Sequence, residues 1–423
     1  MREINLGYGR SSVVLPFDEE RYQILGNTDS SAQALSDLEI GLAFDAPIGS
    51  PPFEEIVSPG DSVLIVVSDA TRATASAQIV NLLVRRLIQS RVSPSDIAII
   101  FATGIHRPVS VPEKQDLLTP FIFQRVQTID HDPYDPTQLH LADLPCGTPI
   151  RVNRALKAFS RVIIIGGIGF HYFAGFTGGR KSICPGLASA ETIKATHMLA
   201  LDFENGGRRD GVGAGLLDEN AVHNACDYVA NLISPAFCIN TVVDDLGRAV
   251  QVYAGGWRAS HRVACDEYLA SHSHRIGNKR ELVVTSCGGF PWDINLIQAH
   301  KALEMASFAC SPGGTIILLA ECGDGLGNKD FLKWFDSKDS ALLEARLRQS
   351  YEVNGQTAWS LMLKTEKFQI VLVSSFADDD VRKMRMVPMP TLYEAIRSIG
   401  GNKKGYIMPR GAAVLPVPGM PPD

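Results

Sequence analysis

Side chains capable of acid, base and anion-binding chemistry follow three apolar runs of the chain. Asp69 and Arg72 lie in SDATR (68–72), His106 lies in TGIHRP (103–108), and His171 follows GGIGF. If these runs are neighbouring parallel strands, the residues at their carboxyl ends share one crevice, which is where open α/β sheets bind ligands. Histidine exchanges protons near neutral pH, and arginine grips carboxylates. Any one of these residues alone would more often be a hydrogen-bonded loop residue, but several at successive strand ends favour a site.

The segment GFTGGRKS (175–182) combines glycines with cations, as a phosphate-binding loop does. It misses the P-loop pattern because Arg180 stands where the second glycine is required. The stretch before it misses the dinucleotide-binding pattern G-x-G-x-x-G, because Gly167 and Gly169 are followed by Tyr172 where the third glycine is required. The loop therefore indicates a phosphate cradle of another kind. The alternative interpretation of the loop is a plain glycine-rich turn. The alternative functions for the protein are an ATP- or NAD-dependent kinase or dehydrogenase and a non-catalytic binding protein.

The sequence offers no set of residues for a protein-only metal site. The eight cysteines contain no Cys-x-x-Cys pair, and His197, which follows the helical stretch AETIKAT, has no second histidine four residues on. If His197 binds a metal, the other ligands must come from a cofactor.

The elements that would position these residues alternate between apolar β-branched runs and segments of helical period, which predicts an α/β fold with mainly parallel sheets flanked by helices. We expect two such domains, at 1–272 and 273–423, joined by a polar linker at 270–280. A proline-rich tail, VLPVPGMPPD, ends the chain. The predicted strands of the first domain are 62–68, 97–104, 161–167 and 236–243, with a helix at 78–90. Those of the second domain are 281–287, 314–320 and 368–375, with helical stretches at 298–310 and 330–349.

Charge and hydropathy exclude several classes of protein. The 40 Lys and Arg against 46 Asp and Glu give a net charge of 40 − 46 = −6, which offers no basic face for nucleic acid. No apolar run approaches the roughly 20 residues of a membrane helix, and the amino terminus lacks the apolar region of a signal peptide. We therefore expect a cytoplasmic protein that binds neither nucleic acid nor membrane.

Nearly the whole chain resembles the lactate racemase family, whose members use a nickel-pincer nucleotide. The resemblance is most specific in five stretches, namely SDATR, TGIHRP, FHYFAGFTGGRKSICPGLAS (170–189), His197 and GGFPWDINLIQAHK (288–301).

The resemblance implies a nickel-dependent isomerase that racemises or epimerises a 2-hydroxy acid by reversible hydride transfer. Lys181 is similar to the lysine that attaches covalently to the cofactor, pyridinium-3,5-bisthiocarboxylic acid mononucleotide, and His197 to the protein ligand of Ni(II). The loop residues expected near the cofactor are Thr177, Gly178, Gly179, Arg180 and Ser182, together with Asp69.

The resemblance also implies the residues that act on the substrate. His106 and His171 are similar to the paired acid/base histidines, and Arg72 and Lys301 to cations that position the substrate, with Gln298 and Ile297 beside them. Because Lys301 belongs to the second domain, the active site is expected in the inter-domain cleft, with that domain closing over it. The expected partners are a small 2-hydroxy acid and the proteins that make the cofactor.

The chain departs from the pattern of lactate-type members at four positions, where it has Ala70, Ala73, Ile297 and Gln356. These changes leave the expected catalytic set intact and alter the expected pocket lining. The substrate is therefore either lactate-like or a longer or more polar 2-hydroxy acid.

Overall fold

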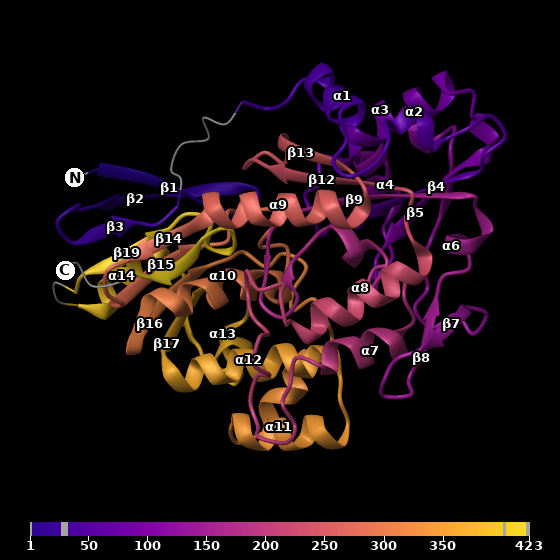
Figure 1. Ribbon diagram of the computed structural model, residues 1–423. Helices are drawn as coiled ribbons and strands as arrows, with labels where there is room; N and C mark the ends of the chain where they lie inside the picture. The colour runs from indigo at the N-terminus through magenta and orange to yellow at the C-terminus, as the bar shows by residue number, and fades with distance from the viewer. Residues whose placement is uncertain (1, 27–32, 401–402, 420–423) are drawn as a thin grey trace. The chain divides into compact units, whose positions relative to one another are not determined.

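The computed structural model describes residues 2–26, 33–400 and 403–419, and Figure 1 shows the path of the chain. The chain divides into two compact units. Unit 1 comprises Met1–Ser30, Leu201–Arg208 and Leu269–Asp423, and unit 2 comprises Ser31–Ala200 and Arg209–Tyr268. The boundary between Tyr268 and Leu269 lies near the predicted one, between residues 272 and 273. Unit 1 also includes Met1–Ser30 and Leu201–Arg208, which the sequence analysis assigned to the first domain. The described residues of both segments pack among the strands and helices of unit 1.

Unit 2 is built on a six-stranded sheet of order β13-β12-β9-β4-β5-β6, parallel except for β13. Its strands are β4 (Val63–Ser68), β5 (Ile97–Ala102), β6 (Gln127–Ile129), β9 (Arg161–Gly167), β12 (Phe237–Val243) and β13 (Ala249–Gly255), with smaller pairs β7 (Leu139–Asp143) and β8 (Pro149–Val152), and β10 (Phe170–His171) and β11 (Gly175–Phe176). All four strands predicted for this part of the chain are confirmed.

Helices cover both faces of this sheet, with α1 and α3 on one side and α7 and α8 on the other (Figure 1). The helices of unit 2 are α1 (Asp37–Asp45), α2 (Phe53–Ile56), α3 (Ser76–Gln89), α4 (Val111–Leu118), α5 (Pro120–Phe123), α6 (Ala155–Ala158), α7 (Ala190–Met198), α8 (Ala221–Ile233) and most of α9 (Trp257–His272). Alternate residues of β4, such as Val63 and Ile65, pack against the α3 side. The predicted helix at 78–90 is α3.

Unit 1 holds a second six-stranded sheet, of order β18-β17-β16-β15-β19-β3, in which every pair is parallel. Its strands are β3 (Tyr22–Ile24), β15 (Arg280–Ser286), β16 (Cys310–Leu319), β17 (Gln369–Val373), β18 (Val387–Met389) and β19 (Gly405–Met408), with two further pairs, β1 (Arg2–Tyr8) and β2 (Ser11–Phe17), and β14 (Ser273–Ile276) and β20 (Leu415–Pro418). The helices are α10 (Leu296–Ala309), α11 (Ser340–Gln349), α12 (Val353–Lys367), α13 (Asp378–Lys383) and α14 (Leu392–Ile399).

Two predictions about polar or proline-rich segments are wrong. The expected linker at 270–280 contains the end of α9 and strand β14, and the expected tail contains β20, which pairs with β14 in parallel register. This pairing joins residues about 140 positions apart, so neither segment shows it locally. Residues 420–423 of the tail lie outside the described residues.

In the ranges that the structure describes, no helix has the length and apolar character needed to cross a membrane.

Candidate active site

The site in unit 2 lies where β4, β5 and β9 end. Ser68, the last residue of β4, pairs with Ala102, the last residue of β5, and β9 runs parallel on the other side of β4. The chain therefore delivers Asp69, His106 and His171 from the same edge of the sheet, as the alternation of strands and helices predicts.

Asp69 and His106 form a hydrogen-bonded pair. Asp69 is buried, and its Oδ2 lies 2.6 Å from Nδ1 of His106, while its Oδ1 accepts from the Thr71 hydroxyl at 2.6 Å. Burial alone would raise the pKa of Asp69, but His106, Arg72 and the hydrogen bonds outweigh it and lower the pKa to about 2. Asp69 is thus an ionised carboxylate that orients the imidazole of His106.

His171 lies beside Lys181. His171 ends β10, and its Nδ1 accepts from the backbone N–H groups of Phe173 at 3.2 Å and Ala174 at 3.1 Å. Its Nε2 lies 3.5 Å from Nζ of Lys181, which a short 3₁₀ helix, Gly179–Ser182, carries. The structure therefore brings together an imidazole and an amine that are ten residues apart in sequence.

The amine of Lys181 has a lowered pKa. Burial lowers its pKa to about 8, and the positive charges of Arg180 and Arg72 act in the same direction. Among the described residues, Lys181 has no ion pair with a carboxylate. About a tenth of the amine is therefore neutral and nucleophilic at pH 7, far more than for an ordinary lysine.

The glycine-rich loop before Lys181 is held by the protein. Gly178 and Gly179 have φ values of 78° and 49°, which favour glycine, and a Cβ on Gly179 would lie 2.6 Å from the His261 ring. Asn240 accepts from the Gly179 N–H at 2.9 Å, and the Thr177 hydroxyl donates to the Gly167 carbonyl at 2.6 Å. Sequence reasoning missed Asn240, although a polar residue inside the apolar run 236–243 was a visible signal.

Arg180 points into the protein. Its guanidinium donates to the carbonyls of Ala174 at 2.7 Å and Phe176 at 3.1 Å, and it lies 2.8 Å from Nε2 of His261. Only Nε lacks a hydrogen-bond partner. The predicted phosphate contact of Arg180 would have to use that nitrogen. Since this buried side chain occupies the position of the second P-loop glycine, the loop does not wrap as a P-loop.

His197 is a buried imidazole near the end of α7. Its Nδ1 donates to the Ile193 carbonyl at 3.0 Å, because a carbonyl can only accept, and this leaves the lone pair on Nε2. Burial, with a smaller effect of Lys181, lowers the pKa of His197 to about 3, so the ring is neutral. A neutral imidazole whose other nitrogen is tied to a carbonyl is the usual form of a metal ligand.

A metal at His197 would need ligands from outside the protein. The described residues contain no group of three or more His, Cys, Asp or Glu side chains arranged to hold a metal ion. The amine of Lys181 and the lone pair of His197 therefore fit a metal that arrives with an attached organic cofactor.

Three further predicted site residues, Ile297, Gln298 and Lys301, lie on α10 of unit 1. Asn295 caps this helix, accepting from the Gln298 N–H at 3.0 Å, and the Lys301 amine donates to Oε1 of Gln298. Ile297 is partly exposed on the same helix. Gln356, singled out as a departure in the expected pocket lining, is fully buried in α12 and accepts from the Tyr351 hydroxyl.

Sequence reasoning missed a buried charge cluster one turn further along α10. Glu304 forms ion pairs with Arg208 at 2.9 Å and with Lys364 of α12. Lys364 also donates to the carbonyl and hydroxyl of Ser360, both at 2.9 Å. Charged residues inside amphipathic segments carry no sequence signal of their burial, so the cluster shows only in the fold.

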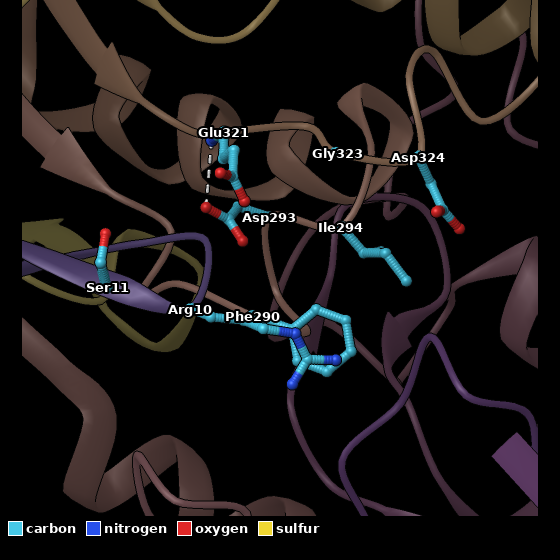
Figure 2. A pocket seen from close by; sticks show the side chains of 8 residues that line it. All are labelled: Arg10, Ser11, Phe290, Asp293, Ile294, Glu321, Gly323 and Asp324. Carbon is cyan, nitrogen blue, oxygen red and sulfur yellow. Dashed lines mark hydrogen bonds between the residues drawn. The ribbon is translucent and has the colours of Figure 1, made fainter. Parts of the chain in front are cut away.

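Unit 1 also has a polar pocket of about 420 Å³, shown in Figure 2. Arg10 lies over the Phe290 ring, 4.1 Å from its centroid. Buried Asp293 accepts from the N–H groups of Gly9 at 2.7 Å and Glu321 at 3.0 Å. Asp293 therefore ties the β1–β2 turn and the end of β16 to the loop that leads into α10. The lining residues are Arg10, Ser11, Phe290, Asp293, Ile294, Glu321, Gly323 and Asp324.

Comparisons with known proteins cover both units. A family model described as "Lactate racemase N-terminal domain" matches residues 8–207, and one described as "Lactate racemase C-terminal domain" matches residues 277–415. The chain is 30% identical to the lactate racemase of Lactiplantibacillus plantarum, over 98% of this chain and all of that protein. It is 28% identical to the lactate racemase of Thermoanaerobacterium thermosaccharolyticum, over 98% of this chain and 99% of that one.

The fold is also shared with solved structures. The lactate racemase apoprotein from T. thermosaccharolyticum superposes with a TM-score of 0.86 at 27% identity, covering 98% of this chain and all of that one. A protein from Thermotoga maritima gives a TM-score of 0.71 at 19% identity, covering 91% and 99% of the two chains, and shows the fold alone.

Proposed function

The chain belongs to the lactate racemase family, and we propose that it is a nickel-dependent racemase or epimerase that acts on a 2-hydroxy acid. The observation that carries the proposal is the grouping in unit 2 of a lysine with a lowered pKa, a neutral buried histidine and two further histidines at strand ends.

The residues present fit the nickel-pincer nucleotide of the family. Lys181 would supply the amine for covalent attachment, and Nε2 of His197 would bind the nickel. Thr177, Gly178, Gly179 and Ser182 would lie about the nucleotide. When bound, the cofactor supplies an acceptor for the hydride of the substrate Cα. The proteins that synthesise it are the proposed partners.

The protein's own residues handle the proton and the substrate's charge. A 2-hydroxy acid can lose hydride from Cα only as its hydroxyl loses a proton. His106, oriented by Asp69, and His171 would be the acid/base pair that exchanges this proton for the two enantiomers. Arg72 would bind the carboxylate or stabilise the developing carbonyl oxygen, and Lys301 and Gln298 of α10 would bind the rest of the substrate.

The proposed substrate is lactate or a longer, more polar 2-hydroxy acid, since Ala70, Ala73 and Ile297 replace residues of lactate-type members.

Two measurements test the proposal on protein produced together with cofactor-synthesising proteins. Intact mass should show a nucleotide-sized adduct that Lys181→Ala lacks, and metal analysis should show about one nickel per chain. The loaded protein should invert Cα of at least one acid in a panel of chiral 2-hydroxy acids. Loaded protein that leaves every member of a broad panel unchanged would exclude the proposed activity.

A further inference from the structure

We propose that Arg180 is a positioning residue, which fixes the turn that carries His171 against the short helix that carries Lys181. The contacts that make this link lie within unit 2. The effect of the link on turnover rests on the proposed racemase function.

The turn after His171 determines where the imidazole lies. β10 and β11 pair His171 with Gly175, so residues 172–174 connect two very short strands. The N–H groups of Phe173 and Ala174 in this connection donate to Nδ1 of His171, at 3.2 and 3.1 Å. A shift of the turn would therefore shift the ring that it holds.

Arg180 binds the carbonyl side of the same turn. Its Nη2 donates to the Ala174 carbonyl at 2.7 Å and to the Phe176 carbonyl at 3.1 Å. Ala174 thus bonds to Arg180 through its carbonyl and to His171 through its N–H. A continuous chain of hydrogen bonds consequently leads from the guanidinium to the imidazole.

The other side of the guanidinium is anchored by His261 of α9. Nη1 of Arg180 lies 2.8 Å from Nε2 of His261, and the His261 ring packs so closely on Gly179 that a Cβ there would lie 2.6 Å from it. Gly179 and Arg180 precede Lys181 in the short 3₁₀ helix. The side chain of Arg180 therefore spans from the backbone that carries the amine to the turn that carries the imidazole.

The surroundings of Arg180 favour a role in geometry over one in charge pairing. The residue is 1% exposed, and within the described ranges no carboxylate forms an ion pair with it. A buried cation without a counter-charge is costly, so charge pairing does not account for its presence. The planar guanidinium has nitrogens spaced to reach two carbonyls and an imidazole at once, whereas lysine has a single nitrogen.

The link bears on the 3.5 Å separation between Nε2 of His171 and Nζ of Lys181. In the proposed reaction the cofactor is attached at Lys181 and His171 exchanges the hydroxyl proton, so the two groups must stay in register. A misplacement of about 1 Å can cost about 100-fold in rate. Loss of the Arg180 bonds should lower kcat more than substrate affinity, because the proposed substrate-binding cations, Arg72 and Lys301, belong to other segments.

Hydrogen exchange of the cofactor-free protein tests the link itself. Arg180→Lys keeps a positive charge but loses the fork, and it should speed exchange of the Phe173 and Ala174 amides by about tenfold or more. Arg248→Lys, at a half-exposed arginine paired with Asp244, is the matched control and should leave these amides unchanged. Unchanged exchange at both amides in folded Arg180→Lys would overturn the inference.

A second variant covers the case in which the lysine variant does not fold. Arg180→Gln buries no charge and loses the same bonds, so it should show the same faster exchange. Failure of both variants to fold would make Arg180 a residue of overall stability and would also overturn the positioning role.

The kinetics of cofactor-loaded protein test the effect on turnover. With rates expressed per bound nickel, Arg180→Lys should lower kcat by about 10–100-fold and change KM by about threefold or less. If Arg180 only stabilised the fold, the loaded fraction or the melting temperature would fall while kcat per nickel stayed the same, and this result would refute the positioning role with the racemase function still standing. Faster amide exchange in the variant, combined with loaded unsubstituted protein that is inactive on every 2-hydroxy acid, would refute the function and leave the link standing.

Discussion

Each unit of the molecule contains a lysine amine withdrawn from water, and the two amines have different surroundings. Lys364 of unit 1 is paired with Glu304, donates twice to Ser360 and lies 3.3 Å from Nε2 of His300. Lys181 of unit 2 has the His171 ring at 3.5 Å and the charges of Arg72 and Arg180 nearby. Burial lowers the pKa of both amines, but only Lys364 has a carboxylate that opposes this effect. The comparison indicates that a buried lysine paired with a carboxylate stabilises the fold, whereas a lysine without such a pair would be available for the proposed chemistry.

The largest expected effect comes from removing the partner of Lys364. Glu304→Ala leaves two cations, Lys364 and Arg208, without their buried counter-charge, and it should destabilise unit 1 by about 3–5 kcal/mol. Urea unfolding followed by the fluorescence of Trp334 and Trp359, both buried in unit 1, measures this loss. Asp378→Ala, which breaks an exposed pair with Arg382, is the control and should cost about 1 kcal/mol or less. Similar losses in the two variants would contradict the structural role given to the buried cluster.

An intermediate effect is expected in the reactivity of Lys181. Because its pKa is about 8 rather than 10.5, its neutral fraction rises as the pH passes through 8, well below the range in which ordinary lysines lose their proton. At pH 8 an amine-reactive reagent should therefore modify Lys181 about tenfold faster than exposed lysines, allowing for its partial exposure. Peptide mass spectrometry of cofactor-free protein, sampled over time from pH 6 to 10, gives the rates. Lys364 should stay unmodified until unit 1 unfolds, and equal rates for the two lysines would end the distinction between them.

The smallest effect concerns the helix that presents His197. The Ser189 hydroxyl accepts from the Thr192 N–H at 3.1 Å, so Ser189→Ala should cost about 1 kcal/mol and speed amide exchange at Thr192. Ser189→Asp keeps the cap and should restore the protection of the Thr192 amide from exchange.

Asn295→Ala removes the corresponding cap of α10 and should lower the free energy of unfolding by about 1 kcal/mol as well, since capping does not depend on which unit contains the helix. Hydrogen exchange with mass spectrometry detects both changes.

The sequence predicted the parts of the fold that depend on local pattern. Apolar β-branched runs at 62–68, 97–104 and 161–167 became the central strands of unit 2, and 281–287 became β15. The polar residues after the first three runs were predicted to converge because parallel strands end at one edge. Contacts between distant segments were not predictable in this way. β3 joins the sheet of unit 1 beside β19, and β14 pairs with β20, although neither short strand has a strong pattern.

The candidate site shows the same limit. Residue types and spacing singled out His106 and His171 as candidates, and the family resemblance added the roles of Lys181 and His197. Neither predicted the direction in which Arg180 points or the support that Asn240 gives the loop. The hydrogen-bond partners of each imidazole also follow from three-dimensional packing. A buried ion cluster such as that of Glu304 is equally invisible in a sequence whose charges occur throughout its helices.

The pairing of β3 with β19 has a consequence for how the protein is made on the ribosome. The strand at Tyr22–Ile24 is synthesised long before its neighbour, Gly405–Met408. At about 5–20 residues per second, the first strand must wait roughly 20–80 s for its partner. All of unit 2 is synthesised in the interval, so its folding can precede completion of the other sheet. The edge of β3 meanwhile remains unpaired, and nascent chains stalled before residue 405 are therefore expected to be those most in need of a chaperone.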